Sequence, residues 1–298
     1  MLELPILSAS DSPPAFRWDE WYAGVGGRTI HVPEVQEYLH KIQTEQYPRC
    51  EGPVAAVRQE FGSPEEAAAH IKEKATEFGA DAVGVCLIEP SDLYRGRSIS
   101  ETHAIALAKR MRWRAFQTVP SREAAIECMR IYYDLGETVI QLAEYIRSIG
   151  YGCNVEHPIG DSNLLHIPIA LKAGFGELGR HGSVIHPRLG PLFRMGSIAT
   201  TLPMATDSPI DAGIAAFCDK CRACRIYCPA NANTPTTAAP KRGKITWGTI
   251  AIRLTPGAVS RTSPSITTAR PVCRFASITT RSGRAISTAT KPNFSPTW

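Results

Sequence analysis

Four closely spaced cysteines followed by a proline are the feature that most constrains this chain. Cys218, Cys221, Cys224 and Cys228 precede Pro229 in the spacing C-x2-C-x2-C-x3-C-P. Three thiolates at this spacing fold around one corner of a cuboidal cluster, and in two-cluster ferredoxins the fourth cysteine of such a run ligates the other cluster. A zinc site would use two cysteine pairs separated by a longer loop. The spacing therefore predicts [4Fe–4S] binding and electron transfer at low potential.

The motif is only half of a two-cluster site. The first cluster needs a distant fourth ligand beside Cys218, Cys221 and Cys224, and the second needs three cysteines besides Cys228. Only Cys273 follows the motif in the sequence. The sequence thus predicts one nearly complete set of ligands and a part of another.

The segment after the motif differs in composition from everything before it. Residues 231–298 contain ten Lys or Arg, 21 Ser or Thr and no Asp or Glu. Their apolar residues follow neither the period of a strand nor that of a helix. One interpretation is a disordered tail rich in Ser, Thr and Arg. The other is that residues 233–298 are translated out of frame, and we favour it because the change comes directly after a motif that demands continuation.

The positive charge of the chain lies in this tail. Of the 33 Lys and Arg, ten are in the tail, which leaves 23 against 28 Asp and Glu in the rest of the chain. This mildly acidic body disfavours nucleic acid as a partner. We find no apolar run long enough to span a membrane and no secretory signal, so we expect a cytoplasmic protein. The scattered Cys86, Cys128 and Cys153 are expected to be inert buried thiols.

Helices and strands alternate in the first 210 residues. Ser63 and Glu66 form a capping box that predicts a helix from Pro64 to a stop at Gly79. Ser121 predicts the start of a long helix that ends at Gly150. Apolar spacing predicts that the inward face of this helix consists of Ile126, Met129, Tyr133, Ile140, Ala143 and Ile146. The further expected elements are strands at 81–88, 103–108, 151–158 and 194–202 and a short helix at 164–173, which together indicate an α+β or α/β sandwich.

Four glycines, at positions 174, 176, 179 and 182, cannot all lie inside a helix. They predict a loop whose backbone approaches something large and flat, or packs against another segment of the chain. The sequence G-F-G-E-L-G follows a helix-like stretch instead of a strand, so it is not a dinucleotide fingerprint.

Several motifs taken together resemble the corrinoid-dependent reductive dehalogenases. They are AEYIRSIGYGCNVEHP, GFGELGRHG, HPRLGP and RMGSIATTLPM, followed by the cysteine motif. The resemblance covers about residues 120–230 and, more loosely, 60–120. The same core is similar to the epoxyqueuosine reductases of transfer-RNA modification, whose C-terminal helical repeats have no counterpart here.

The resemblance implies a domain organisation. We expect an N-terminal arm (1–60), a nitroreductase-like corrinoid-binding α/β domain (61–210), a truncated ferredoxin-like 4Fe–4S segment (211–232) and an irregular tail (233–298).

It also implies an activity. Electrons would pass from [4Fe–4S] clusters to cobalamin, which would reductively dehalogenate an organohalide, often an aromatic one. The implied partners are this small substrate and an electron-donor protein such as a ferredoxin or a reductase. Two alternatives stay open: an epoxyqueuosine reductase-like enzyme, which would bind RNA, and an inactive fragment that binds corrinoid or iron–sulfur clusters.

Site residues follow from the resemblance and from the chemistry of proton transfer. Tyr132 or Tyr133 is the candidate proton donor, with Lys172 or Arg194 as the neighbouring cation. Glu177 and Arg180 are candidates for contact with the cofactor, or they pair with each other. The full set of candidate cofactor-binding residues is His166, Gly174, Gly176, Glu177, Gly179, Arg180 and Gly182. We expect His157, His166, His181 and His186 to be structural or to contact the corrin, and the metal ligands to be the four clustered cysteines.

Overall fold

The computed structural model describes residues 32–117, 121–221 and 223–226. The predicted out-of-frame tail, Cys228 and Cys273 lie outside these residues. Sixteen elements are described. The helices are α2 (Pro33–Lys41), the π-helix η2 (Ile42–Gln46), the 3-10 helix η3 (Tyr47–Arg49), α3 (Pro64–Glu77), the 3-10 helix η4 (Pro90–Asp92), α4 (Trp113–Gln117), α5 (Arg122–Ser148), α6 (His166–Lys172), α7 (Ile214–Cys221) and α8 (Ala223–Ile226). The strands are β1 (Ala82–Leu87), β2 (His103–Arg110), β3 (Cys153–Glu156), β4 (Glu177–Leu178), β5 (Val184–Ile185) and β6 (Phe193–Thr200).

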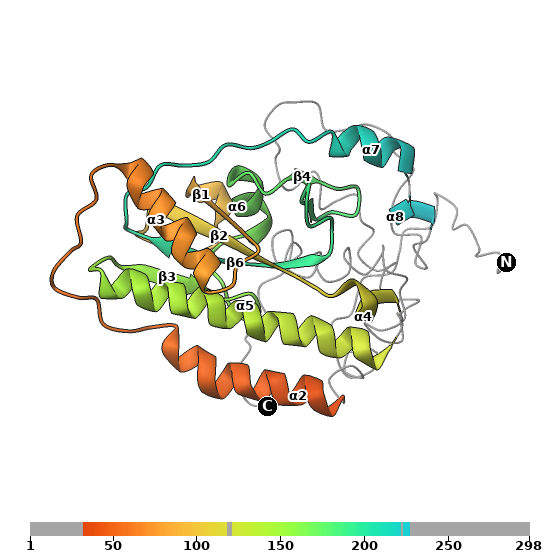
Figure 1. Ribbon diagram of the computed structural model, residues 1–298, viewed down its shortest axis with the longest axis horizontal. Helices are drawn as coiled ribbons and strands as arrows, with labels where there is room; N and C mark the ends of the chain where they lie inside the picture. The colour runs from red at the N-terminus through yellow and green to blue at the C-terminus, as the bar shows by residue number, and fades with distance from the viewer. Residues whose placement is uncertain (1–31, 118–120, 222, 227–298) are drawn as a thin grey trace.

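An antiparallel sheet with the order β1-β2-β6-β3 forms the centre of the molecule (Figure 1). The mixed helix and strand class predicted from the sequence is therefore confirmed, with antiparallel pairing throughout this sheet. The predicted strands and the short helix are found close to the expected positions. The nitroreductase-like and ferredoxin-like details remain predictions.

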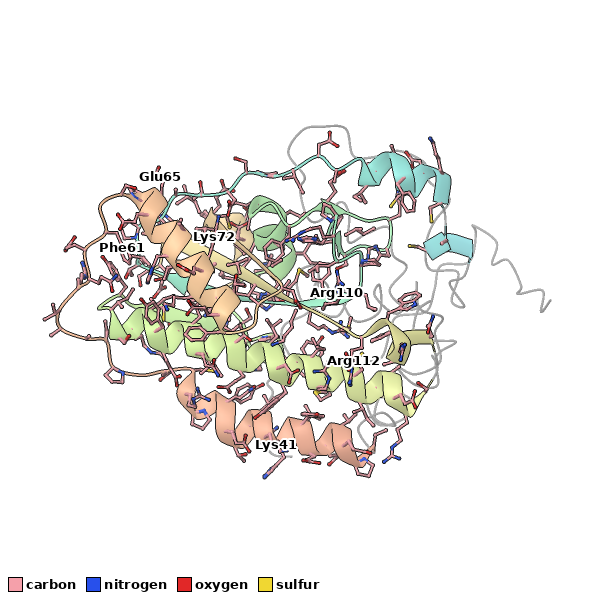
Figure 2. All side chains as sticks on the ribbon, in the orientation of Figure 1. Lys41, Phe61, Glu65, Lys72, Arg110 and Arg112 are labelled. Carbon is pink, nitrogen blue, oxygen red and sulfur yellow. The ribbon has the colours of Figure 1, made fainter. Side chains whose placement is uncertain are left out.

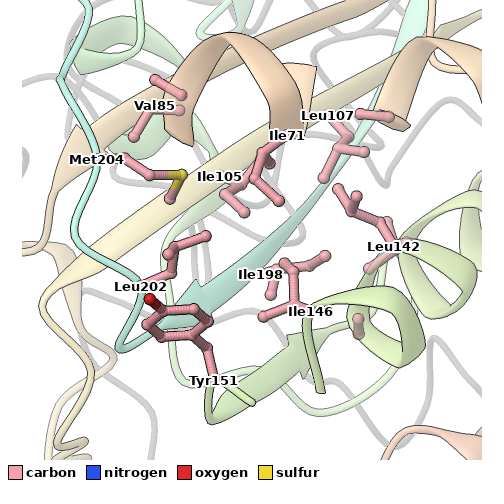
Figure 3. Packing of buried hydrophobic residues seen from close by; sticks show 14 of the residues in the cluster. Ile71, Val85, Ile105, Leu107, Leu142, Ile146, Tyr151, Ile198, Leu202 and Met204 are labelled. Atoms are coloured by element: carbon pink, nitrogen blue, oxygen red, sulfur yellow. The ribbon is translucent and has the colours of Figure 1, made fainter. Parts of the chain in front are cut away.

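Alternation along β2 explains the layers. Ile105 and Leu107 point to a core shared with α3 and α5, whose members include Ile71, Leu142 and Ile146 (Figure 3). Between them, small residues such as Ala106 face the other side of the sheet, where α6 packs. Because successive side chains of a strand point to opposite faces, large residues fill one interface and alanines allow α6 to approach closely at the other. The result is a sheet between α3 and α5 on one face and α6 on the other.

The two predicted helix starts are confirmed in detail. Ser63 Oγ accepts a hydrogen bond from the Glu66 backbone N–H at 3.2 Å, and Ser121 Oγ accepts one from the Ala124 N–H at 3.1 Å. Glu66 closes the cap one residue earlier than a capping box does, because its carboxylate binds the N–H of Gly62. Both helices end at glycines with positive φ, as predicted: Gly79 at 97° and Gly150 at 88°.

The predicted inward face of α5 is wrong in its first half. Ile140, Ala143 and Ile146 are buried as expected, but Ile126, Met129 and Tyr133 are only partly buried. The residues buried in that half include Ile131 and Leu135, with Val139 continuing the same face. The physical reason is that α5 has two covered sides, since α2 packs beside it and the ring of Tyr133 lies 5.7 Å from that of Tyr38.

The chain leaves β6 along the free edge of the sheet. Residues 201–213, here called the strap, run past α3 and β1 to α7 (Figure 1). Asp207 pairs with Val85 of β1 through its backbone N–H and its carboxylate, both at 2.8 Å. The other carboxylate oxygen of Asp207 lies 2.7 Å from Lys72 of α3, which Figure 2 labels. The strap therefore covers backbone groups that an edge strand would expose and leads the chain to the cysteine segment.

None of the helices in the described part of the chain combines the length and the apolar character needed to cross a membrane.

Candidate functional site

The first three cysteines of the motif lie on two short helices. Cys218 is buried on α7, Cys221 is exposed at the end of the same helix, and Cys224 is partly buried on α8. Burial raises the pKa of the Cys218 thiol, while a hydrogen bond from the backbone N–H of Arg180 acts in the opposite direction. This N–H···S contact ties the first cysteine to a segment that lies far from it in the sequence.

The three described cysteines do not fit a bound cluster in this arrangement. A cuboidal cluster needs several thiolates that face one point. Among the residues that the structure describes, no group of three or more His, Cys, Asp or Glu side chains could hold a metal ion. We therefore derive no electron-transfer step through this segment.

A buried arginine and a tyrosine form the clearest polar constellation in the sheet core. Arg194 of β6 is 5% exposed, and its guanidinium carbon lies 4.7 Å from the ring centroid of Tyr132 on α5. Its Nη2 donates to Cys128 Sγ at 3.2 Å. Since Cys128 and Tyr132 are four residues apart, both project from the same face of α5. The arginine is thus held between two residues of one helix.

The charge of this group is retained although it is buried. Burial disfavours the charged guanidinium, but Tyr132 and Cys128 outweigh that effect and raise the Arg194 pKa overall. Among the described residues, its Nε–H has no hydrogen-bond partner. A buried cation with an unused donor beside a phenol is a place where a polar or anionic group can bind. This orphan donor is the observation in the structure that fits a bound cofactor or substrate at Tyr132.

The other two candidates for this role are engaged elsewhere. The hydroxyl of Tyr133 donates to Glu45 at 3.1 Å; burial raises the Tyr133 pKa, and the Glu45 carboxylate adds to this. The ammonium of Lys172 lies 2.7 Å from the buried carboxylate of Asp92 and 3.5 Å from Glu89. The structure therefore brings Tyr132 together with Arg194 and gives Tyr133 and Lys172 other partners.

Sequence reasoning missed the residues that support this turn of α5. Gln46 is fully buried, and its Nε2 donates to the carbonyl oxygen of Tyr133 at 2.9 Å. Its Oε1 lies 3.0 Å from Nε2 of His157. Nδ1 of His157 lies 2.7 Å from the carbonyl oxygen of Ile159, and burial lowers the His157 pKa to about 4. The signal in the sequence was Gly136, a glycine inside a helix, which leaves room for these two side chains.

The other three histidines named in the sequence analysis are partly or fully buried: His166 is partly buried, and His181 and His186 are buried. His166 Nδ1 lies 2.7 Å from Ser197 Oγ, and burial lowers the His166 pKa. Burial also lowers the pKa of His181 to about 4. His186 Nδ1 accepts the backbone N–H groups of Arg188 and Leu189. These contacts agree with a structural role for His186 and leave contact with a corrin as a prediction for His166 and His181.

The glycine-rich segment forms the β4–β5 hairpin. A Cβ at Gly176 would lie 2.0 Å from the carbonyl oxygen of Ile185, and one at Gly179 would lie 2.4 Å from Nδ1 of His181. A Cβ at Gly174 would lie 2.9 Å from the carbonyl oxygen of Ser208. At these three positions the glycines allow the backbone to pack against another segment of the chain, which was the second of the two predictions from the sequence. The chain itself occupies the space that the glycines leave open. The polar residues of the hairpin, Glu177 and Arg180, contact the cysteine helix.

Known proteins with similar sequences and structures indicate what this chain is related to. No protein-family model matches the chain. It is 30% identical over 154 residues to a tetrachloroethene reductive dehalogenase of Dehalobacter restrictus, which is 52% of this chain and 27% of that protein. It is 32% identical over 117 residues to an epoxyqueuosine reductase of Salmonella typhimurium, with 39% of this chain and 27% of that protein covered.

A solved structure agrees with these matches. The catabolic reductive dehalogenase NpRdhA in complex with 3-bromo-4-hydroxybenzoic acid has a TM-score of 0.63 and 26% identity over 73% of this chain and 34% of that one. Over this part of its length the chain is therefore similar in fold to a reductive dehalogenase. It is a relative of the corrinoid-dependent reductive dehalogenases, and more distantly of the epoxyqueuosine reductases. It spans about a third or less of the length of these relatives.

Proposed function

We propose that this chain is the core of a corrinoid-dependent enzyme that reductively dehalogenates an organohalide of the halogenated-phenol class. The observation that carries the proposal is the buried Arg194 guanidinium over the ring of Tyr132, with its Nε–H unused by the described residues. The kinship with reductive dehalogenases supports the reaction. The bromo-hydroxybenzoate bound to a relative supports the substrate class.

Replacing a halogen by hydrogen consumes two electrons and one proton and releases a halide ion. A bound corrinoid would supply the low-valent cobalt that passes the electrons to the carbon–halogen bond. Tyr132 would hold the proton on its phenolic oxygen and donate it to the carbon. Arg194 would then stabilise the phenolate, because opposite charges attract strongly where water is excluded. The Cys128 and Tyr132 contacts keep this cation in place before the reaction begins.

Binding of the cofactors is part of the same proposal. Residues 61–210 would form the corrinoid-binding domain, with His166 and the β4–β5 hairpin, including Gly182, at its cofactor side. Residues 211–232 would form the ferredoxin-type segment, with iron bound by Cys218, Cys221, Cys224 and Cys228. Because the described thiols do not face one point, iron binding by this segment is tested by measuring the iron content of the chain.

Anaerobic reconstitution with cobalamin, iron and sulfide tests the proposal. The full chain is analysed for cobalt and iron and is then supplied with a bromophenol and a low-potential chemical reductant. We expect one cobalt per chain and release of bromide. Tyr132→Phe should bind cobalt equally and lose turnover by about 10²–10⁴-fold, the usual contribution of a positioned proton donor. Tyr133→Phe is the matched control and should retain turnover.

The outcomes separate the alternatives. About eight irons with turnover supports a complete two-cluster enzyme, whereas four or fewer without turnover identifies a cofactor-binding fragment. Reduction of epoxyqueuosine in transfer RNA without bromide release would identify the second enzyme class. A chain that binds no cobalamin would overturn the proposal.

A further inference from the structure

The N-terminus of the cysteine helix is capped by a residue from another part of the chain. Oε1 of Glu177 accepts the backbone N–H groups of Ala212 at 2.5 Å and Ile214 at 3.1 Å. Its Oε2 accepts the N–H of Ala215 at 3.4 Å. The first N–H groups of a helix lack partners within the helix, and a negative charge is favourable there. One carboxylate of the β4–β5 hairpin therefore satisfies three donors at the start of α7.

A second residue of the same hairpin binds the middle of that helix. The guanidinium of Arg180 forms an ion pair with Asp219 of α7. The backbone N–H of Arg180 donates to the sulfur of Cys218, the residue before Asp219. Two residues of the hairpin separate Glu177 from Arg180, so α7 is held at its start by Glu177 and in its second half by Arg180. We call these contacts the hairpin latch.

The helix has little else to hold it in the described structure. Cys218 is the one residue of α7 that is buried among those described, and Phe217 beside it is 60% exposed. Helices usually owe their place to a buried apolar face, which α7 lacks here. Figure 1 shows α7 at the end of the strap, beyond the sheet and next to β4. The polar contacts of the latch are therefore the main described link between the cysteine helix and the sheet domain.

The hairpin itself is a firm support. Its glycines are packed against the chain, and the backbone N–H groups of Gly179 and Gly182 bond to the carbonyl oxygens of Ser183 and Gly179. β4 and β5 pair in register at Glu177 with Ile185. A rigid loop with a carboxylate and a guanidinium on one side is suited to fix the position of a helix that would otherwise be loosely attached.

We propose that Glu177 and Arg180 are positioning residues that dock the cysteine helix on the glycine-rich hairpin and set the place of Cys218. The two motifs that stand about 40 residues apart in the sequence then act as one unit, with the hairpin controlling access to the first cysteine. This goes beyond the proposed reaction, because it concerns the placement of the thiol and holds whether or not the chain dehalogenates.

Thiol labelling of the reduced, metal-free full chain tests the latch. Alkylation by iodoacetamide is followed for each cysteine-containing peptide by mass spectrometry. Glu177→Ala should raise the labelling rate of Cys218 about tenfold, the effect of losing charge-assisted hydrogen bonds. Glu177→Gln keeps one acceptor oxygen and should recover part of the protection. Arg180→Met and Asp219→Asn should each raise the rate about 2–5-fold, and the double variant should do no more than either alone, since they remove the same ion pair.

Internal controls make each result decisive. Glu65→Gln changes an exposed glutamate at the start of α3, far from α7 (Figure 2), and should leave Cys218 unchanged. Cys86, buried in the sheet, reports on the fold as a whole and should stay protected in every variant. Unchanged labelling of Cys218 in Glu177→Ala and Arg180→Met would overturn the proposal. Equal increases at Cys218 and Cys86 would also overturn it, because they would mean general loosening of the fold. So would no recovery in Glu177→Gln, because the acceptor oxygen that this variant keeps would then play no part in placing Cys218.

Discussion

Replacing Gly136 by alanine should destabilise the protein, although Gly136 lies inside α5, where alanine is ordinarily the better residue. Helix propensity alone predicts that the free energy of unfolding rises by about 1 kcal/mol. The structure instead predicts that the free energy of unfolding falls, because a Cβ at this position would lie 2.3 Å from Nε2 of His157 and 2.6 Å from Oε1 of Gln46. The imidazole cannot bend away, so either it or the helix must shift.

The two contributions can be weighed. Overpacking of an interior costs about 1–3 kcal/mol. The shift also breaks the buried hydrogen bond between Gln46 and His157 and strains the one from Gln46 to the Tyr133 carbonyl, at about 1–3 kcal/mol for the groups left unpaired. After the gain in propensity, the free energy of unfolding should fall by about 1–5 kcal/mol. For a domain of this size the melting temperature should then drop by on the order of 10 °C.

Urea denaturation and thermal melting of the full chain measure this change. Gly152→Ala is the matched control, because its Cβ would meet Thr201 only at 3.6 Å and 3.8 Å, which are ordinary contacts. We expect the control to stay within about 0.5 kcal/mol of the original chain. If Gly136→Ala is as stable as the original chain or more stable, the packing around Gln46 and His157 is not as described and the reasoning fails.

Three further predictions concern pH, the strap and the buried cation. Because burial lowers the His157 pKa from 6.5 to about 4, the unfolded chain alone takes up this proton as the pH falls from 6.5 to 4. The free energy of unfolding should therefore decrease by about 3 kcal/mol across that window, and His157→Gln should flatten the pH profile of urea denaturation; an unchanged slope would contradict the assignment. Asp207→Ala should cost about 1–3 kcal/mol and speed amide hydrogen exchange at Val85, whereas slow exchange there would show that the strap is held by other contacts. Arg194→Met should lower dehalogenation by about 10²-fold, with Arg194→Lys intermediate and cobalt content unchanged; equal turnover in all three proteins would exclude a role for this cation beside Tyr132.

How far the site could be predicted is clearest at Tyr132 and Tyr133. The sequence narrowed the candidate proton donor to these two neighbours and the candidate cation to Lys172 or Arg194. Adjacent residues of a helix point about 100° apart, so the rotation of α5 about its axis decides which tyrosine meets β6. That rotation depends on α2 and on the sheet, which cover different sides of α5. The period of the apolar residues within one helix could not reveal that α2 and the sheet pack on different sides of α5.

Contacts between residues that lie far apart in the sequence could not be predicted from local sequence patterns. Gln46 lies beside His157 although 111 positions separate them, and Glu177 caps a helix that begins 37 residues further on. Cys128 looked like an inert thiol, yet it accepts a hydrogen bond from Arg194. Each of these contacts joins elements that become neighbours only after the sheet forms.

By itself the sequence determined the spacing of the thiols, the caps of α3 and α5, the glycine stops and the kinship with reductive dehalogenases, because these depend on residues within a few positions of each other or on motif identity. Only the tertiary structure decided the strand order, the pairing of Tyr132 with Arg194 and the docking of Cys218 on the hairpin. These depend on burial and hydrogen bonding between segments far apart in the chain, and local sequence patterns do not encode which distant segments will meet.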